Sequence, residues 1–139
     1  MEITVETNIK APLESVWEAW TTPKVIQEWN GAMSDWYCPK AEVDLHEGGK
    51  FIYQIERSDG SEVVHFEGVF KRLKLLQLIE YRFIDGRRAS VHFRENSHGT
   101  SVHETIELDP SSPEAQQTSQ HGHIMAYFKK IIETNRLLS

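Results

Sequence analysis

The stretch APLESVWEAWTTPKVIQEW, residues 11–29, decides the fold because the spacing of the apolar residues changes within it. It begins with apolar positions at the three- and four-residue intervals of an amphipathic α-helix. These positions are Leu13, Val16, Trp17 and Trp20. Thr22 and Pro23 match an N-cap followed by proline at the first helical position, so they predict a second short helix that runs through Trp29.

The segments on both sides of this stretch alternate between apolar and polar residues, as strands with one buried face do. Residues 2–9 alternate in this way before the helices, and several short runs do so between Ala41 and about Leu108. The turn signals within the second region are SDG at 58–60, DG at 85–86 and NSHG at 96–99. Short strands separated by such turns predict one curved antiparallel sheet of about six to seven strands.

A long final helix is predicted from residue 112 onward. Ser112 supplies a hydroxyl cap, Pro113 suits the first helical position, and Glu114 places an acid near the positive end of the helix dipole. Met125 and Phe128 share one apolar face of this helix. Because the concave face of the sheet is the surface able to bury that face, we predict an α+β fold in which one domain, residues 1–139, wraps its sheet around the helix.

Composition excludes several classes of protein. The net charge of −6 and the scattered Lys and Arg residues argue against a nucleic-acid-binding surface. No apolar run approaches the roughly 20 residues that span a bilayer, and the first ten residues lack the features of a secretory signal. A single cysteine excludes an internal disulfide framework and suits a reducing compartment. We therefore expect a cytoplasmic protein, a monomer or homodimer, with no nucleic-acid or membrane partner.

The chain resembles the SRPBCC superfamily of START-like, helix-grip proteins. The segments that carry the resemblance are residues 11–29 together with DLHEGGKFIY (44–53), FEGVF (66–70) and FKKII (128–132). Within the superfamily they are similar to the family named after the activator of the ninety-kilodalton heat-shock protein ATPase. The resemblance implies a cavity between sheet and final helix that holds an apolar small molecule. Relatives include lipid carriers, hormone receptors, cyclases and chaperone partners, so the fold alone selects no function.

One position departs from the family pattern. Members commonly have glycine followed by tryptophan near the start of the last helix, whereas here Gly122 precedes His123. The role of that tryptophan therefore does not transfer to this chain.

Strand alternation and helix periodicity predict which residues face the cavity. The expected wall residues are Phe51, Tyr53, Phe66, Phe70, Tyr81, Phe83, Phe93, Met125 and Phe128. Glu104 shares a strand face with Val102 and Ile106, so its carboxylate is predicted to point inward, where a charge is costly unless it is paired, hydrated or protonated. His121 lies on the inward face of the last helix. Glu104 and His121 are thus the candidate polar anchors for a ligand. The structural alternative for Glu104 is a bulge that turns its side chain outward or an internal salt bridge. The alternative for His121 is a core histidine whose hydrogen bonds are satisfied within the protein.

The segment WNGAMSDWYCP, residues 29–39, fits neither a helix nor a strand. Trp36 is interpreted either as a rim residue of the cavity or as a cap on the core, and both interpretations stay open. Trp29 is expected in the core because it completes a helical stripe. Cys38 has no neighbouring base to lower its pKa, so a buried structural thiol is expected.

Neither a metal site nor a cofactor is predicted. The strand histidines alternate with apolar neighbours and so belong to the outer face of the sheet, and no spacing matches a zinc or iron site. These are His65, His92 and His103. Gly48 and Gly49 fit a tight turn with positive backbone angles better than a phosphate-binding loop.

Three functions are compatible with the sequence. The first is binding of a small, largely apolar ligand in the cavity, without chemistry. The second is interaction with a chaperone, as the family name suggests. The third is an enzyme, a cyclase or hydrolase, in which Glu104 and His121 transfer protons. Simple binding ranks first because no spacing of nucleophile, base and orienting residue is visible in the sequence.

Overall fold

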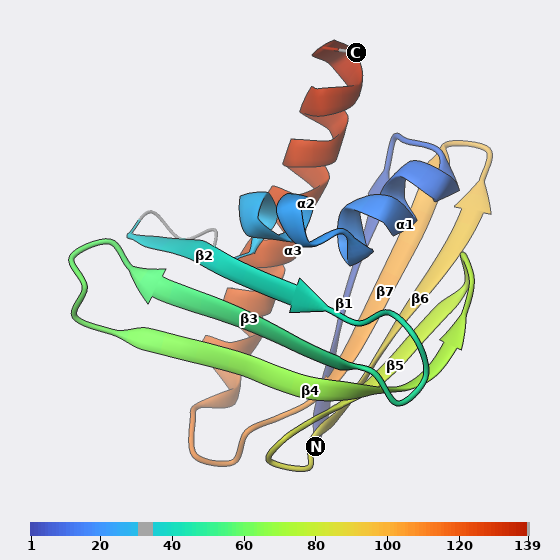
Figure 1. Cartoon of the computed structure of the whole chain (residues 1–139). Helices are drawn as coiled ribbons and strands as arrows, with labels where there is room; N and C mark the ends of the chain where they lie inside the picture. The colour runs from blue at the N-terminus through green and yellow to red at the C-terminus, as the bar shows by residue number, and fades with distance from the viewer. Residues whose placement is uncertain (31–34, 139) are drawn as a thin grey trace.

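The computed structural model describes residues 1–30 and 35–138 and shows a seven-stranded antiparallel sheet that curls around a long helix (Figure 1). The strands are β1 (Glu2–Ile9), β2 (Trp36–Val43), β3 (Lys50–Arg57), β4 (Val63–Lys74), β5 (Leu78–Phe83), β6 (Arg88–Asn96) and β7 (Gly99–Glu107), and the helices are α1 (Leu13–Thr21), α2 (Pro23–Trp29) and α3 (Glu114–Leu138). The strand order is β1-β7-β6-β5-β4-β3-β2. This is the α+β helix-grip fold that the sequence predicts.

Glycines with positive φ angles stand in the predicted turns between strands. Gly60 and Gly86 have φ angles of 79° and 95°, in the left-handed region that glycine enters without steric cost. Gly48 also has a positive φ, 88°, and a Cβ on Gly49 would collide with the carbonyl oxygen of Asp44. The prediction of a tight turn at Gly48 and Gly49 is therefore confirmed.

The prediction that residues 36–39 are irregular is wrong, because they form the first half of β2. Among the described strands β2 lies at the edge of the sheet and pairs to β3 alone, so the missing N–H of Pro39 is tolerated there. The pairing register also shifts between Tyr37 and Lys40, which breaks the two-residue period on which a strand prediction depends. Gly31 and Ser34, on which the prediction also rested, lie outside the described residues.

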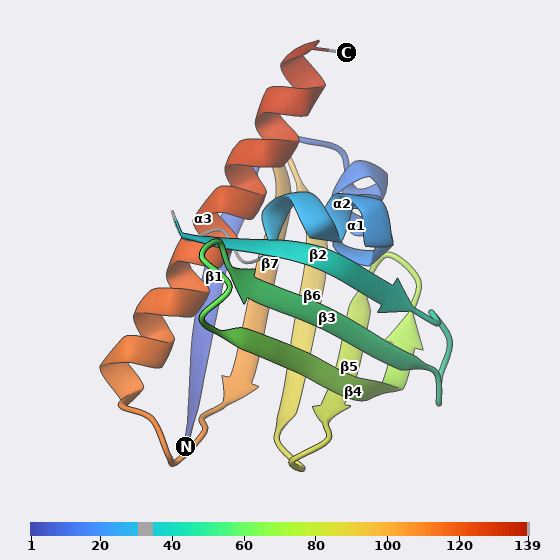
Figure 2. The same ribbon diagram turned by 60° about the vertical axis from the view of Figure 1, so that its left-hand side comes forward.

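Helices α1 and α2 cover one end of the curled sheet, where α1 packs against β6 and β7 and α2 against β2 (Figures 1 and 2). Thr22 occupies the predicted N-cap position of α2, but its side chain makes no capping hydrogen bond. Its backbone carbonyl instead accepts hydrogen bonds from the N–H groups of Val25 and Ile26. The predicted position of the cap is therefore confirmed.

Helix α3 runs along the concave side of the sheet, and its C-terminal turns extend beyond the strands (Figure 2). The buried Gln117 secures its start, since its amide nitrogen donates to the carbonyl oxygens of Asp109 and Ser112 and its amide oxygen accepts from the N–H of Asp109. None of the helices in the described part of the chain has the length and hydropathy needed to cross a membrane.

A group of aromatic side chains, which we call the tryptophan cluster, fills the core beneath α1 and α2. It consists of Trp17, Trp20, Trp29, Phe93 and Phe128. The ring centroids of Trp20 and Phe128 are 4.9 Å apart, and those of Trp29 and Phe128 are 4.8 Å apart, both in edge-on geometry. The indole N–H of Trp29 donates to the carbonyl oxygen of Ala19, so the polar atom of this buried ring is satisfied.

Candidate functional site

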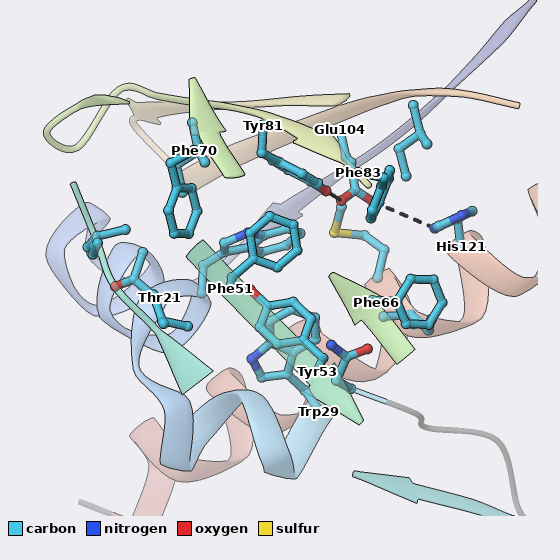
Figure 3. Close-up of a pocket in the computed structure, with 18 residues that line it drawn as sticks. Thr21, Trp29, Phe51, Tyr53, Phe66, Phe70, Tyr81, Phe83, Glu104 and His121 are labelled. Atoms are coloured by element: carbon cyan, nitrogen blue, oxygen red, sulfur yellow. Dashed lines mark hydrogen bonds and ion pairs between the residues drawn. The ribbon is translucent and has the colours of Figure 1, made fainter. Parts of the chain in front are cut away.

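A cavity of about 70 Å³ lies between α3 and the concave face of the sheet (Figure 3). Nine of the predicted site residues line it: Phe51, Tyr53, Phe66, Phe70, Tyr81, Phe83, Glu104, His121 and Met125. Six of these are aromatic side chains of β3, β4 and β5, which we call the aromatic wall: Phe51, Tyr53, Phe66, Phe70, Tyr81 and Phe83. A single water needs roughly 10–15 Å³, so the cavity has room for several water molecules or a small ring.

Two predicted wall residues lie elsewhere. Phe93 and Phe128 belong to the tryptophan cluster, where they contact Trp17 and Trp20 rather than open space. They do face inward, as the alternation of β6 and the periodicity of α3 predict. Their placement in the cavity wall was wrong because α1 and α2 fill the interior at this end of the molecule.

An open groove of about 760 Å³ adjoins the cavity, bounded by strand ends on one side and the N-terminal half of α3 on the other. Phe66, Phe83, His121 and Ile124 line both spaces. The cavity and the groove are therefore separated by these four side chains. The groove is more polar than the cavity and carries both acidic and basic groups, among them Arg57, Glu62, Asp85 and Arg87.

Trp36 lies in the wall of this outer groove rather than in the cavity. The guanidinium of Arg57 stacks on its ring at 4.7 Å from the centroid and also forms a 3.1 Å ion pair with Glu62. Trp29, by contrast, is both a core residue and part of the cavity lining. Cys38 is a buried thiol whose pKa is raised by burial, which agrees with the predicted structural role.

The carboxyl group of Glu104 enters the cavity from β7 (Figure 3). The two-residue period of β7 places it between Val102 and Ile106, which are both buried. Its Oε2 accepts a 3.2 Å hydrogen bond from the hydroxyl of Tyr81. Burial raises the pKa of Glu104 to about 7, and the hydrogen bond from Tyr81 opposes this shift only in part.

The imidazole of His121 approaches the same carboxyl group from α3. Its Nδ1 is 4.0 Å from Oε1 of Glu104, and 21% of its side chain is exposed. Burial lowers the pKa of His121 to about 4, and the positive charge of Arg87 contributes to this shift. Between these two pKa values, Glu104 holds its proton and His121 is neutral, so the pair carries no charge.

The phenol groups of Tyr53 and Tyr81 are hydrogen-bond donors at this site. Burial is the main cause that raises the pKa of each, and the nearby carboxyl of Glu104 raises both further. They therefore stay protonated at any ordinary pH. Glu104 thus lies among neutral, polarisable groups, which can bind an uncharged polar atom and offer no countercharge to an ion.

The sequence did not identify several residues that line the cavity. These are Trp20, Thr21, Asn30, Val43, Leu45, Ile79, Ile106 and Ile124. Ile79 and Ile106 share strand faces with predicted residues, so alternation could have identified them. Asn30 follows α2 and has no periodic partner, and nothing in its local sequence marks it as buried.

The other histidines are distributed as expected. His65, His92 and His103 are exposed on the strands. His123 is exposed on α3, and its Nδ1 lies 2.8 Å from the carbonyl oxygen of Ser119. No three His, Cys, Asp or Glu side chains within residues 1–30 and 35–134 are arranged to hold a metal ion.

Comparisons with known proteins agree with this geometry. Residues 10–134 match the family model described as "Activator of Hsp90 ATPase homolog 1-like protein". The chain belongs to this family. The solution structure of an AHSA1-like protein from Aeromonas hydrophila is 36% identical, with a TM-score of 0.92 over 99% of this chain and 95% of that one. A solution structure from Cytophaga hutchinsonii is 34% identical, with a TM-score of 0.84 over 96% of this chain and 93% of that one.

A further solved structure shares the fold at low identity. A crystal structure from Nitrosomonas europaea has a TM-score of 0.83 over 99% of this chain and 97% of that one, at 14% identity. Among curated proteins, no significant match was found.

Proposed function

We propose that this protein binds a small, largely apolar molecule in the cavity between the sheet and α3. The observation that carries the proposal is a hollow lined by eight aromatic side chains, the six of the aromatic wall together with Trp20 and Trp29, that also contains a buried carboxyl and an imidazole. Ligand sites have this composition, with apolar walls and a few convergent polar groups. A core that served only stability would gain by filling the space and by replacing Glu104 with an apolar residue.

The size of the cavity limits the ligand. Typical sites for drug-sized ligands measure roughly 300–1,000 Å³. The cavity of about 70 Å³ accepts a body of about one ring, and anything longer must continue between Phe66 and Ile124 into the outer groove. Met125, a flexible and unbranched side chain in the lining, is the residue best able to adjust to the shape of the ligand.

Ile124→Trp tests this proposal by placing a large side chain where cavity and groove meet. Binding of toluene would be followed by NMR through the indole N–H of Trp29, which lines the cavity. We expect toluene to shift this resonance in the unaltered protein, and Ile124→Trp to weaken binding by about tenfold or more because the added ring occludes the space.

Ile131→Trp is the matched control, since Ile131 is also a partly buried isoleucine of α3 that packs on the core. It should leave the binding of toluene unchanged. Equal effects of the two substitutions, or the absence of any shift in the unaltered protein, would contradict the proposal.

Chaperone interaction is a second candidate, favoured by membership of a family named after a chaperone activator. The test is the ATPase rate of a purified ninety-kilodalton heat-shock protein with and without this chain. A rate that rises with the concentration of the chain would support this function, and a constant rate would exclude activation.

Proton transfer is a third candidate, because a buried carboxyl and an imidazole face each other across 4.0 Å. The only hydroxyl-bearing aliphatic side chain in the described lining is Thr21, and its Oγ1 already donates to the carbonyl oxygen of Trp17 at 2.8 Å. The pair therefore has a donor and an acceptor but no adjacent nucleophile, and binding accounts for it better than catalysis does.

A further inference from the structure

The polar end of the cavity contains two atoms that face each other without bonding. Oε2 of Glu104 is occupied by the hydroxyl of Tyr81, whereas Oε1 is 4.0 Å from Nδ1 of His121. Hydrogen bonds of this kind have donor–acceptor distances of about 2.7–3.2 Å, so the two atoms are too far apart to bond directly. Figure 3 marks this approach with the dashed line between Glu104 and His121.

A single ligand atom can close this gap. An oxygen placed about 2.8 Å from both Oε1 and Nδ1 forms a triangle whose apex angle is roughly 90°, within the broad range of directions that a hydroxyl oxygen accepts. The bridging group must donate one hydrogen bond and accept another, because one of the two facing atoms carries a proton and the other a lone pair. A hydroxyl does both, whereas an ether or a ketone can only accept.

This match holds in both protonation states of the carboxyl group. Below the pKa of Glu104, the carboxyl proton is donated to the hydroxyl, which in turn donates to the unprotonated nitrogen of His121. Above it, the hydroxyl donates to the carboxylate of Glu104 and accepts from the N–H of the other imidazole tautomer. A hydroxyl can therefore form both hydrogen bonds whether or not Glu104 is charged.

The charges around the cavity disfavour an anionic ligand group. Arg87, whose side chain lies in the groove, forms a 2.8 Å ion pair with Asp85 and stacks on Phe83 at 4.8 Å. Its charge is thus already compensated, and no Lys or Arg belongs to the described lining of the cavity itself. A ligand carboxylate would be buried beside Glu104 without a counterion, which is strongly unfavourable.

We propose that the ligand is an uncharged apolar molecule with one hydroxyl, an alcohol or a phenol, and that Glu104 and His121 hold this hydroxyl between Oε1 and Nδ1. The proposal rests on the ligand-binding function above and names its substrate class. The apolar body of the ligand then lies against the aromatic wall, with Phe51 and Phe83 on the side of the sheet and Met125 on the side of α3. Glu104 and His121 are the residues that determine specificity.

Three one-ring probes that differ in a single group test the proposal. They are p-cresol, toluene and 4-methylbenzoate, titrated separately into the protein and followed by NMR through the indole N–H of Trp29. We expect p-cresol to bind about tenfold more tightly than toluene, because two additional hydrogen bonds form, and 4-methylbenzoate to bind more weakly than either.

Substitutions at the two polar residues separate the hydroxyl contact from the apolar contacts. In Glu104→Leu and in His121→Leu, toluene should still bind, and the affinity for p-cresol should become about equal to the affinity for toluene. His123→Leu, an exposed position on the same helix, is the control and should keep the full preference. If Glu104→Leu does not fold, His121→Leu decides, because its side chain is partly exposed and easier to replace.

The possible results distinguish the two proposals. Equal binding of p-cresol and toluene, binding of 4-methylbenzoate as tight as that of p-cresol, or a preference that survives both leucine variants would overturn the hydroxyl contact and leave the ligand-binding function intact. Failure of toluene to bind the unaltered protein would overturn the ligand-binding function itself.

Discussion

The tryptophan cluster and the aromatic wall lie in the same interior, but all six rings of the wall border the cavity, whereas in the cluster only Trp20 and Trp29 do. In the cluster, rings from α1, α2, β6 and α3 meet edge to face at 4.8–6.0 Å and fill the volume between the layers. In the wall, the rings come from neighbouring strands, and their centroids are 5.2–6.3 Å apart. Rings on one face of the sheet contact each other side by side, so the space between them and α3 must be filled by side chains of α3.

The side chains of α3 that face the two groups of rings explain why one end is filled and the other is hollow. Phe128, opposite the tryptophans, is fully buried, whereas His121 and Ile124, opposite the aromatic wall, are smaller and partly exposed. The N-terminal half of α3 also exposes two glutamine side chains, Gln116 and Gln120, to the groove. The same helix therefore closes the interior at one end and leaves it open at the other. A solid end can hold the fold together while the hollow end retains a polar pair that reduces stability.

The largest expected effect comes from truncating a ring at each end. Phe128→Ala should lower the free energy of unfolding by about 4 kcal/mol, because it removes a fully buried ring between Trp20 and Trp29 and leaves a cavity. Phe66→Ala should cost only about 1 kcal/mol, since this ring already borders the cavity and the groove. Urea denaturation of both variants measures the difference. Equal losses would mean that the two ends are equally well packed.

The residues at the two ends differ in how far the sequence can predict them. Glu104 and His121 were placed correctly because periods of 2 and 3.6 residues fix the face to which a side chain belongs. The same rule put Phe93 and Phe128 on the inner face but could not tell how deep they lie, because α1 and α2, which cover them, come from another part of the chain. The groove was not predicted, since its residues come from strand ends and α3 and share no period.

The next effect is the change of the free energy of unfolding with pH, which has opposite signs for Glu104 and His121. Glu104 has a pKa of about 7 in the folded protein against an ordinary value of 4.5, so the folded state binds the extra proton and stability falls as pH rises from about 4.5 to 7. His121 has a pKa of about 4 against 6.5, so the unfolded state binds the extra proton and stability rises between about pH 4 and 6.5. In the unaltered protein these two slopes nearly cancel between pH 4.5 and 6.5.

Single substitutions should remove this cancellation. Relative to the unaltered protein, Glu104→Gln should gain stability as pH rises from 4.5 to 7.5, by up to about 3 kcal/mol. His121→Gln should instead gain as pH falls from 7 to 4, by a similar amount. Denaturant unfolding across this pH range gives both differences, and the titration of other groups is common to all three proteins. Parallel curves for all three would show that the pair is not held uncharged by burial.

The smallest effect tests whether the groove contributes to stability independently of the cavity. Trp36→Ala removes the ring on which Arg57 stacks at 4.7 Å but leaves the ion pair of Arg57 with Glu62 in place. An exposed cation–π contact contributes roughly 0.5–1 kcal/mol, so we expect a loss of about 1 kcal/mol in the free energy of unfolding. Toluene affinity should not change, because Trp36 lines only the groove and the cavity lies beyond Phe66 and Ile124. A loss of toluene affinity in Trp36→Ala would mean that the hollow end acts as one continuous site reaching from Glu104 to the edge strand.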